Sequence, residues 1–399
     1  MDTHTLRISI VLGQRLSWPE MLANARETEE LGFDGLYLVD HFFGLKDVND
    51  PTHEAWTMLA ALAPFTRRLR LGVMVCGNTY RNPVFLLKQA ITVDHVSGGR
   101  VDFGVGAGWL EREHEAYGFP YPDAAERVDR FAEALEIWDA LQRNDRTTFE
   151  GRHYTLLDAP FAPKSLQSPR LPVLIGASKP RMLRLVARHA DIWNMVCTPE
   201  DGAAANGRMD ELCREIGRDP ATLDRAVSPS LNLLASREAF IDGVATYRAA
   251  GFRHITMPWP RTPDEVPVLR DVARTAIPGL RGDAGPVDPA DASVAALRPP
   301  GDADLVALKD QLAGLDDVSR RYLATLAASP DERFESARLR EDLGLASHAE
   351  VTRTVARTAE AFGAIGVERP WSEAQRGYAL SAEMAALLSA ALSLERPNS

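Results

Sequence analysis

An acidic and a basic side chain stand together at Asp40 and His41, at the end of the apolar run DGLYLVD. The run has the length and residue types of a buried β-strand, so the pair is expected where that strand ends. A histidine beside a carboxylate can transfer a proton near neutral pH, or hydrogen-bond a cofactor. A histidine at a strand end is more often structural, so this pair alone does not define a site.

The glycine-rich stretch GGRVDFGVGAGWLEREHEAYG, residues 98–118, places small residues where another strand-like run ends. Glycines at such a point let a flat ligand or a phosphate approach the backbone closely. The stretch is not a dinucleotide fingerprint, because that motif follows the first strand of a βαβ unit and its glycines open a helix. A ligand-binding wall and a simple bend both fit the pattern.

A second group of small residues, Gly176, Ala177 and Ser178, lies between the strand-like run LPVLI and the helix-like run PRMLRLVARHA. Free N–H groups at the start of a helix bind anions, and Lys179 and Arg181 could add positive charge there. The alternative is that Ser178 only caps the helix.

The three cysteines, Cys76, Cys197 and Cys213, have no spacing typical of a metal site, and no metal is expected. Cys76 ends the strand-like run LRLGVMVC, and no basic residue near it in the sequence would lower the pKa of its thiol. We therefore expect it to pack rather than to act as a nucleophile. A low, odd cysteine count fits the reducing cytoplasm.

The elements that must position these residues alternate between strand-like and helix-like runs. Strands are expected at 6–12, 34–40, 69–77, 100–106, 171–177, 190–196, 224–234 and 252–258, and helices at 18–33, 83–97 and 124–143 among others. Parallel neighbours need crossover helices, and eight such units are the content of an α/β (β/α)₈ TIM barrel. An open doubly wound sheet is the alternative. The long segments 107–123 and 145–170 are expected insertions at the strand ends.

Composition changes after the barrel. We predict three parts: residues 1–280 as the barrel domain, 281–302 as a linker rich in Gly, Pro, Ala and Asp, and 303–399 as a small, mainly helical, winged-helix-like domain. Residues 301–399 contain eleven Lys and Arg against sixteen Asp and Glu, a net charge of 11 − 16 = −5. That charge favours a packing or interaction role over DNA binding.

The whole chain of 399 residues has a net charge of −11. This balance disfavours nucleic acid and anionic membranes as partners, because both bind basic surfaces. The sequence contains no apolar run near the ~20 residues that a membrane helix needs. Its first residues lack the pattern of a secretory signal, so a cytoplasmic location is expected.

Two longer stretches carry a resemblance to a known family. They are TYRNPVFLLKQAITVDHVSGGRVDFGVGAGWLEREHEAYGFPYP and LPVLIGASKPRMLRLVARHADIWN. Together they resemble the luciferase-like oxidoreductases, and in particular the branch that uses the deazaflavin coenzyme F420. The likeness covers about residues 6–280. It implies a TIM barrel that holds the flavin-like ring in the mouth at the carboxyl ends of its strands.

The resemblance also implies roles for individual residues. It implies a non-proline cis peptide at Met74–Val75 that supports the ring, and it places the Asp40–His41 pair against the cofactor or the substrate. The expected cofactor-binding positions are Asp40, Met74, Val75, Cys76, Ala107, Gly108, Trp109, Gly176, Ala177, Ser178, Trp193 and Asn194.

The chain departs from the sugar-phosphate dehydrogenases of this family. Gly44 and Trp109 stand at about the places where those enzymes carry a tryptophan and a glutamate. That particular dehydrogenase activity is therefore not expected. His41, with Asp40 beside it, becomes the first candidate for the catalytic proton transfer, and Glu113 the second.

The function expected from these observations is hydride transfer between coenzyme F420 and a small organic substrate. One alternative is an FMN-dependent monooxygenase on the same barrel. A second alternative is a regulator that senses a ligand in the barrel and responds through the C-terminal domain. A homodimer is left open.

Overall fold

The computed structural model describes residues 6–282 and, further on, residues 312, 315–328, 334–346, 350, 351, 354, 355, 358, 362, 371–374, 377–380 and 388. The chain divides into two compact units, Met1–Pro286 and Val287–Ser399. Each is described by itself.

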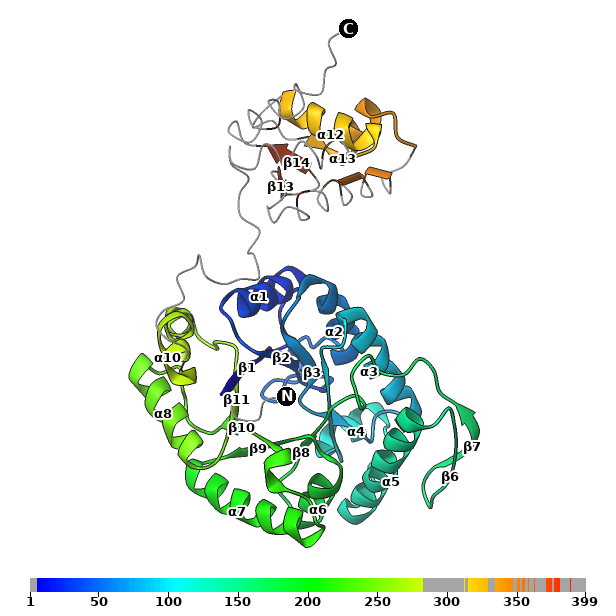
Figure 1. The fold of residues 1–399 in the computed structure, drawn as a ribbon, viewed down its shortest axis with the longest axis vertical. Helices are drawn as coiled ribbons and strands as arrows, with labels where there is room; N and C mark the ends of the chain where they lie inside the picture. Colours follow the sequence, from blue (N-terminus) through cyan, green and yellow to red (C-terminus); the bar gives the residue numbers. More distant parts are fainter. Residues whose placement is uncertain are drawn as a thin grey trace. The chain divides into compact units, whose positions relative to one another are not determined.

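A closed parallel barrel forms the first unit (Figure 1). Within residues 6–282 its strands are β1 (Arg7–Val11), β2 (Gly35–Leu38), β3 (Arg70–Val73), β4 (Cys76–Gly77), β5 (Val101–Gly106), β8 (Val173–Gly176), β9 (Ile192–Cys197), β10 (Asp224–Pro229) and β11 (His254–Pro258). They follow the order β3-β2-β1-β11-β10-β9-β8-β5-β4, and pairing of β3 with β5 closes the ring. β3 and β4 are two parts of one expected strand, so the predicted (β/α)₈ barrel is confirmed.

Helices surround the barrel (Figure 1). They are α1 (Trp18–Glu30), α2 (Ala55–Leu62), η1 (Ala63–Phe65), α3 (Pro83–Ser97), α4 (Glu111–Tyr117), α5 (Ala124–Arg143), α6 (Pro180–His189), α7 (Pro199–Glu215), η2 (Pro220–Thr222), α8 (Arg237–Ala249), α9 (Glu265–Asp271), η3 (Val272–Ala276) and α10 (Ile277–Arg281). α3 and α5 have the predicted bounds. α1 ends earlier than predicted because the chain turns at Gly32, which has a left-handed φ of 80°.

Local signals explain where α3 begins and ends. The Asn82 side chain accepts a hydrogen bond from the N–H of Val84, and Pro83 occupies the first helical position, where no N–H is needed. At the other end Gly98 adopts a left-handed conformation that a glycine takes without strain. The helix therefore starts just after the strand segment that ends at the mouth.

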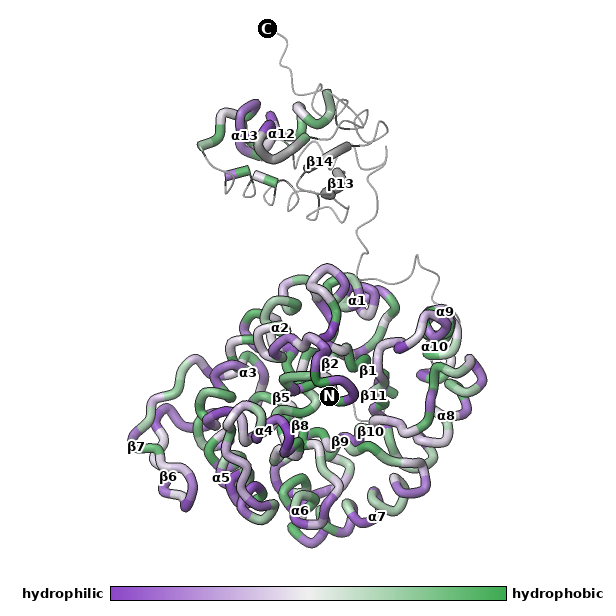
Figure 2. The backbone as a smooth tube through the Cα atoms, turned by 180° about the vertical axis from the view of Figure 1, so that it is seen from behind, coloured by the Kyte–Doolittle hydropathy of each residue, from purple (hydrophilic) through white to green (hydrophobic). Residues whose placement is uncertain are grey.

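The core lies mainly between the barrel and its helices. Phe103 on β5 packs against Trp56 and Trp138, which come from α2 and α5. Figure 2 shows the same division, with largely hydrophobic strands inside and helices of alternating character outside. A smaller apolar cluster containing Tyr37 and Leu174 fills the barrel interior.

A buried polar network occupies the amino-terminal end of the barrel interior. His254 accepts from Arg7 at Nδ1, 3.2 Å away, and its Nε2 lies 2.9 Å from the Ser9 hydroxyl. Arg7 also pairs with Asp224. In barrels of this kind the amino-terminal end serves stability, whereas the carboxyl end carries the site.

Both expected insertions contain regular structure. Residues 107–123 include α4, and residues 145–170 include an antiparallel hairpin of β6 (Arg146–Glu150) and β7 (Thr155–Pro160). The hairpin lies outside the ring of helices, next to α5 (Figure 1). It is therefore not part of the barrel wall.

The second unit contains α12 (Asp317–Ala328), β12 (Phe334–Glu335), α13 (Ser336–Asp342), β13 (Trp371–Ala374) and β14 (Gly377–Leu380). Its strands form an antiparallel sheet in the order β12-β14-β13. Tyr322, Leu326 and Leu339 belong to its own buried core. The winged-helix assignment stays a prediction. Of the predicted linker 281–302, residues 283–302 lie outside the described residues.

Within the described part of the chain, no helix is long and apolar enough to cross a membrane.

Gly104 lies where two barrel strands pack too closely for a side chain. A Cβ atom at this position would collide with the Val73 carbonyl oxygen on the adjacent strand. We expect Gly104→Ala to lower the free energy of unfolding by about 3 kcal/mol or more, because backbone cannot move aside as a side chain does. Gly207→Ala in α7 is the matched control, since nothing lies within 4 Å of its added Cβ. Denaturant unfolding that gives equal values for both variants would contradict this packing.

His254 should make stability depend on pH. Burial, and then the nearby Arg7 and Arg70, hold the pKa of His254 well below its ordinary value of 6.5. The unfolded chain therefore takes up the proton first as the pH falls, and stability is lost below about pH 6.5. We expect His254→Asn to reduce this loss by up to ~1.4 kcal/mol per pH unit between pH 6.5 and 5. Unfolding curves with the same pH dependence in both proteins would refute the assignment.

Candidate active site at the barrel mouth

The mouth is formed by the carboxyl ends of the parallel strands. Among the predicted site residues, those partly or fully exposed there are His41, Met74, Val75, Ala107, Gly108, Trp109, Gly176, Ala177 and Ser178. They come from the ends of β2, β3, β5 and β8, which are neighbours in the closed sheet. The structure thus brings them together on one side of the mouth.

The floor on this side is built from Val75 and bare backbone. The peptide bond Met74–Val75 is cis, as predicted. A Cβ atom on Gly106 would lie 2.9 Å from Cγ2 of Val75, and one on Gly176 would lie 3.0 Å from the same atom. Both positions therefore need glycine, and the Val75 side chain lies over the two glycine backbones as the surface of the floor.

The loop after β5 forms the adjoining wall. Gly108 has a φ of 83°, and a Cβ atom there would collide with Oγ1 of Thr79. This turn directs Trp109 outward, where 63% of the residue is exposed. The Trp109 ring lies edge-on to the imidazole of His41, with 5.6 Å between ring centroids. An exposed tryptophan beside a histidine provides an apolar contact next to a proton-transfer group.

Glu113 is the fixed partner of His41. Its Oε2 lies 3.1 Å from Nδ1 of His41 and accepts the Tyr80 hydroxyl at 2.6 Å, while Oε1 accepts the N–H of Phe42 at 2.8 Å. The side chain is fully buried at the start of α4, and the His41 side chain is 14% exposed. Both catalytic candidates from the sequence therefore touch each other.

These contacts determine the charge of Glu113. Burial acts to raise its pKa, but the hydrogen bonds from His41, Tyr80 and Phe42 outweigh burial and hold the pKa below 4.5. Burial and the same carboxylate raise the pKa of Tyr80 far above 10, so its hydroxyl remains a donor. An ionised Glu113 accepts the Nδ1–H of His41, which leaves Nε2 with the lone pair that can take a proton.

Asp40 is held by partners within the protein, and its predicted place against a cofactor stays a prediction. Its two oxygens accept from Arg81 at 2.7 and 2.8 Å, and one also accepts the N–H of Gly77 at 3.0 Å. Arg81 in turn pairs with Glu54, the N-cap of α2, at 2.7 Å. The carboxylate of Asp40 is 4% exposed. It ties β2 to the segment after β4 rather than presenting an oxygen to a ligand.

Tyr80 and Arg81 are the partners that the sequence interpretation did not assign. Both lie in TYRNP, directly after β4, so they stand at a strand end like the predicted residues. Their position after a strand was the available signal. Nothing in the sequence pairs Arg81 with a carboxylate 41 residues earlier.

The start of α6 offers an anion site after β8. Lys179 is the N-cap, and no side chain donates or accepts a capping hydrogen bond there. The first N–H groups of a helix carry partial positive charge and have no partner within the helix. Arg181 points elsewhere, since it pairs with Asp129 at 2.6 Å. Ser178 and its neighbours are therefore suited to a phosphate through the backbone.

Trp193 and Asn194 support this side of the mouth from below. The indole N–H of Trp193 donates to the Ala177 carbonyl at 2.9 Å, and the side chain is fully buried against the helices. Asn194, 5% exposed, lies inside the barrel near Ser228 and Thr256. The sequence analysis gave Trp193 and Asn194 the same role, but adjacent side chains on a strand point to opposite faces of the sheet. Trp193 thus positions the Ala177 loop rather than lining the mouth.

Cys76 packs as expected and does not reach the mouth surface. It is fully buried, and its Sγ accepts the indole N–H of Trp56 at 3.0 Å. Burial raises the pKa of its thiol well above 9.0, which keeps it protonated. The sequence predicted that Cys76 contacts a cofactor; in the structure it lies next to Val75, below the surface of the mouth.

Among the described residues, no cluster of His, Cys, Asp and Glu could hold a metal ion.

Asn78 adds an unassigned polar group to the site. It follows β4 and is 3% exposed. Its Nδ2 donates to the Tyr154 hydroxyl at 3.3 Å, but its Oδ1 has no partner in the part of the chain described. A buried acceptor without a partner costs free energy, and the Tyr154 contact turns this side chain toward the loop between β6 and β7.

Known proteins resemble this chain in sequence and in fold. The F420-dependent glucose-6-phosphate dehydrogenase of Amycolatopsis mediterranei (strain U-32) is 30% identical over 186 residues, which are 46% of this chain and 54% of that protein. The chain thus spans about half the length of such curated relatives. An F420-dependent secondary alcohol dehydrogenase solved with an F420-acetone adduct shares the fold, with a TM-score of 0.59, 19% identity, and coverage of 67% of this chain and 98% of the other.

A coenzyme F420-dependent tetrahydromethanopterin reductase from Methanopyrus kandleri has a similar fold, with a TM-score of 0.58, 18% identity, and coverage of 68% and 98%. Residues 4–291, most of the chain, match the family described as luciferase-like monooxygenase. The barrel, the glycine floor and this match lead to one conclusion: the chain belongs to the luciferase-like family.

Proposed function

We propose that this protein is an F420-dependent oxidoreductase that transfers a hydride between the deazaflavin and a small organic substrate. The observation that carries the proposal is the flat floor in which Val75 packs against Gly106 and Gly176. Several curated relatives are named F420-dependent glucose-6-phosphate dehydrogenases, and two structural neighbours are named as F420-dependent enzymes; these names support the choice of cofactor.

The residues present fit this cofactor in chemical character. The floor of Val75, Gly106 and Gly176 suits a planar ring, and the start of α6 suits a phosphate. When bound, F420 supplies the carbon that accepts or donates the hydride.

The protein's own part is to move a proton and to exclude water. Nε2 of His41 takes the hydroxyl proton of an alcohol substrate as the carbonyl forms, or returns it in the reverse direction. Glu113 holds the orientation and the tautomer of the imidazole. Trp109 covers the histidine from the solvent side. The proton path thus runs between the substrate oxygen and one nitrogen.

Two further parts of the proposal concern the location of the protein and its oligomeric state. The three free cysteines are buried, which agrees with the reducing cytoplasm that the sequence predicts. A homodimer remains a prediction, and light scattering of the purified protein measures it directly.

F420 binding tests the cofactor assignment. We expect F420 to bind with a Kd in the micromolar range or below, and FMN to bind at least ~100-fold more weakly, in separate fluorescence titrations. Tight binding of FMN without binding of F420 would replace this proposal with the monooxygenase alternative. If neither F420 nor FMN binds, the regulator becomes the favoured hypothesis.

Ser178→Asp tests where the phosphate binds. A carboxylate there should favour α6 through its dipole while it repels a bound phosphate, so F420 affinity should fall at least ~10-fold without loss of stability. Ser236→Asp, at the N-cap of α8 two strands further around the barrel, is the matched control. Equal F420 affinity in both variants would place the phosphate elsewhere.

Glu113→Gln should reverse the His41 tautomer. The N–H of Phe42 requires the amide oxygen at the Oε1 position, which puts the amide NH₂ next to Nδ1 of His41. Nδ1 must then accept, so the proton moves to Nε2 and hydride transfer from a secondary alcohol should fall by about 10²- to 10⁴-fold.

The tautomer is read from the ¹⁵N chemical shifts of the His41 ring. Glu115→Gln is the control, because Glu115 lies on the same helix but is exposed. A proton on Nδ1 in both the parent protein and Glu113→Gln would show that Glu113 does not set the tautomer.

A further inference from the structure

The Trp109 side chain is a large apolar group that is left uncovered at the mouth. It is 63% exposed, and its ring stands edge-on to the His41 imidazole with 5.6 Å between the ring centroids. An indole in this position gains nothing from burial in the free protein, but it offers a rigid apolar surface to a bound molecule. It is therefore available to the same molecule that exchanges a proton with His41.

Trp109 is held in place by its backbone. The Tyr121 hydroxyl donates to the Trp109 carbonyl at 2.9 Å, and Nδ1 of His114 donates to the carbonyl of the following residue at 2.8 Å. Nε2 of the buried His114 lies 2.6 Å from Oγ1 of Thr79, the same atom that a Cβ on Gly108 would strike. The loop thus has its shape before any ligand arrives, so less entropy is lost when the indole is covered.

A second apolar side chain opens into the mouth from β9. Side chains along a strand alternate between its faces, and Asn194 points into the barrel, so Val196 points the same way. Val196 is 73% exposed. β9 and β5, the strand that leads to Trp109, lie on either side of β8. The two exposed apolar groups therefore come from the two neighbours of one strand.

Polar side chains at this end of the barrel are bonded to one another. Inside the barrel, the hydroxyls of Ser228 and Thr256 lie 2.8 Å apart. Beside the mouth, Arg81 is shared between two carboxylates. Nε2 of His41 has no hydrogen bond within the described part of the chain, so it is left for one substrate oxygen. A substrate with many hydroxyls would leave most of them without partners here, which costs free energy.

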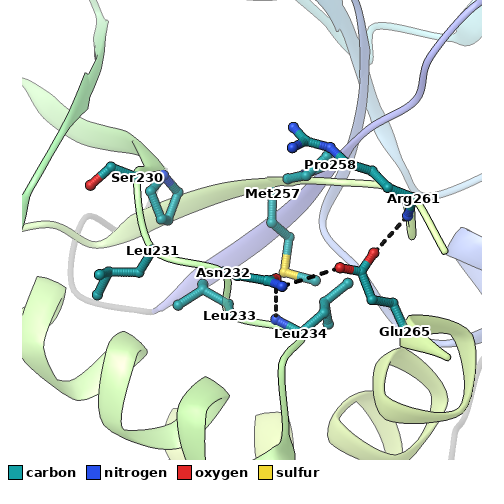
Figure 3. A pocket seen from close by; sticks show the side chains of 10 residues that line it. Ser230, Leu231, Asn232, Leu233, Leu234, Met257, Pro258, Arg261 and Glu265 are labelled. Carbon is teal, nitrogen blue, oxygen red and sulfur yellow. Dashed lines mark hydrogen bonds between the residues drawn. The ribbon is translucent and has the colours of Figure 1, made fainter.

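The hollow between the loops after β10 and β11 does not supply those partners (Figure 3). It has a volume of about 190 Å³, and its lining includes Met257, which is buried, and Leu233, which packs against Gly243 of α8. Its Glu265 carboxylate already accepts a hydrogen bond from Asn232 at 3.2 Å. The hollow thus belongs to the layer between strands and helices and does not face His41.

We propose that Trp109 determines the substrate class, which is an alcohol with an apolar carbon body or the corresponding carbonyl compound. The inference rests on the proposed hydride transfer for its reactive end. The carbinol carbon gives its hydride to F420 and the hydroxyl gives its proton to Nε2 of His41 as the C=O bond forms, while the indole covers the carbon body. A sugar phosphate is disfavoured, because its hydroxyls and charge would lie against apolar surface.

The test follows Trp109 by ¹⁹F NMR in the full-length chain labelled with 5-fluorotryptophan, with the signal assigned by its absence in Trp109→Phe. Two ketones with the same carbon ring are titrated, cyclohexanone and pentahydroxycyclohexanone, each with oxidised F420 and again without it. Oxidised F420 cannot reduce a ketone, so binding is read without turnover. We expect cyclohexanone to shift the Trp109 signal saturably, and the pentahydroxy ketone to bind at least ~10-fold more weakly.

The Trp18 signal is the internal control, because Trp18 is exposed on α1 and packs against Phe65 outside the barrel. It should stay in place throughout. An equal or tighter response to the pentahydroxy ketone would overturn the proposal. So would a Trp109 signal that does not respond to cyclohexanone either with or without F420.

Variants separate contact with the indole from a change in the fold. Their affinity for cyclohexanone is read from the signals of the ketone itself by saturation-transfer NMR. Trp109→Gln should weaken binding at least ~10-fold, whereas Trp109→Phe should stay within ~3-fold of the parent protein. Trp18→Gln is the matched control and should bind as the parent does. The ¹⁹F signals of the remaining tryptophans show that each variant is folded, and unchanged affinity in Trp109→Gln would contradict the assignment.

The titrations need no turnover, so their outcome is separable from the proposed function. A selective Trp109 response in a protein that fails to bind F420 would keep the apolar contact and reject the hydride transfer. F420 binding without any Trp109 response to cyclohexanone would keep the cofactor assignment and reject the substrate class.

Discussion

The packing of Val75 against the backbones of Gly106 and Gly176 is the constraint on which the mouth depends. Closing a parallel barrel turns alternate residues inward. Near the mouth, Val75 leaves no room for a side chain at Gly106 on β5 or at Gly176 on β8. The strand that carries Val75 is interrupted there, so β3 and β4 pair separately with β5. The result is a floor that is fixed by the close packing of Val75 on two glycine backbones.

Two buried carboxylates above this floor are satisfied in different ways, and this difference assigns their roles. Asp40 pairs with a permanently charged guanidinium, so its contacts hold strand ends together at any physiological pH. Glu113 receives hydrogen bonds from His41, Tyr80 and the Phe42 backbone, and the His41 side chain is 14% exposed. Only the second arrangement joins a buried carboxylate to a side chain that reaches the mouth. The polar network around His254, at the other end of the barrel, has no such opening to the mouth.

The strand and helix pattern was predictable from the sequence because both depend on local periodicity, and the bounds of α3 and α5 follow from caps and glycines in the chain itself. The cluster at the mouth was predictable as a set, since strand ends meet in a barrel. Individual roles were less so. Arg81 lies 41 residues from Asp40, and no local rule pairs them. Trp193 and Asn194 are adjacent, yet the register of β9 turns one outward and the other inward.

The mouth has one rigid side and one open side, and this division bears on specificity. Phe42 packs against the rings of Tyr80, Tyr117 and Phe119, and Gln14 ties the carbonyls of Val39 and His53 together, so the segment around His41 is held firmly. On the other side, Val196 at the end of β9 and Leu231 after β10 are 73% and 47% exposed. Exposed apolar side chains at a mouth have no packing role in the free protein, and they cover hydrocarbon when a ligand lies across them. The side around His41 is thus fixed by packing within the protein, whereas the side of Val196 and Leu231 leaves apolar surface uncovered.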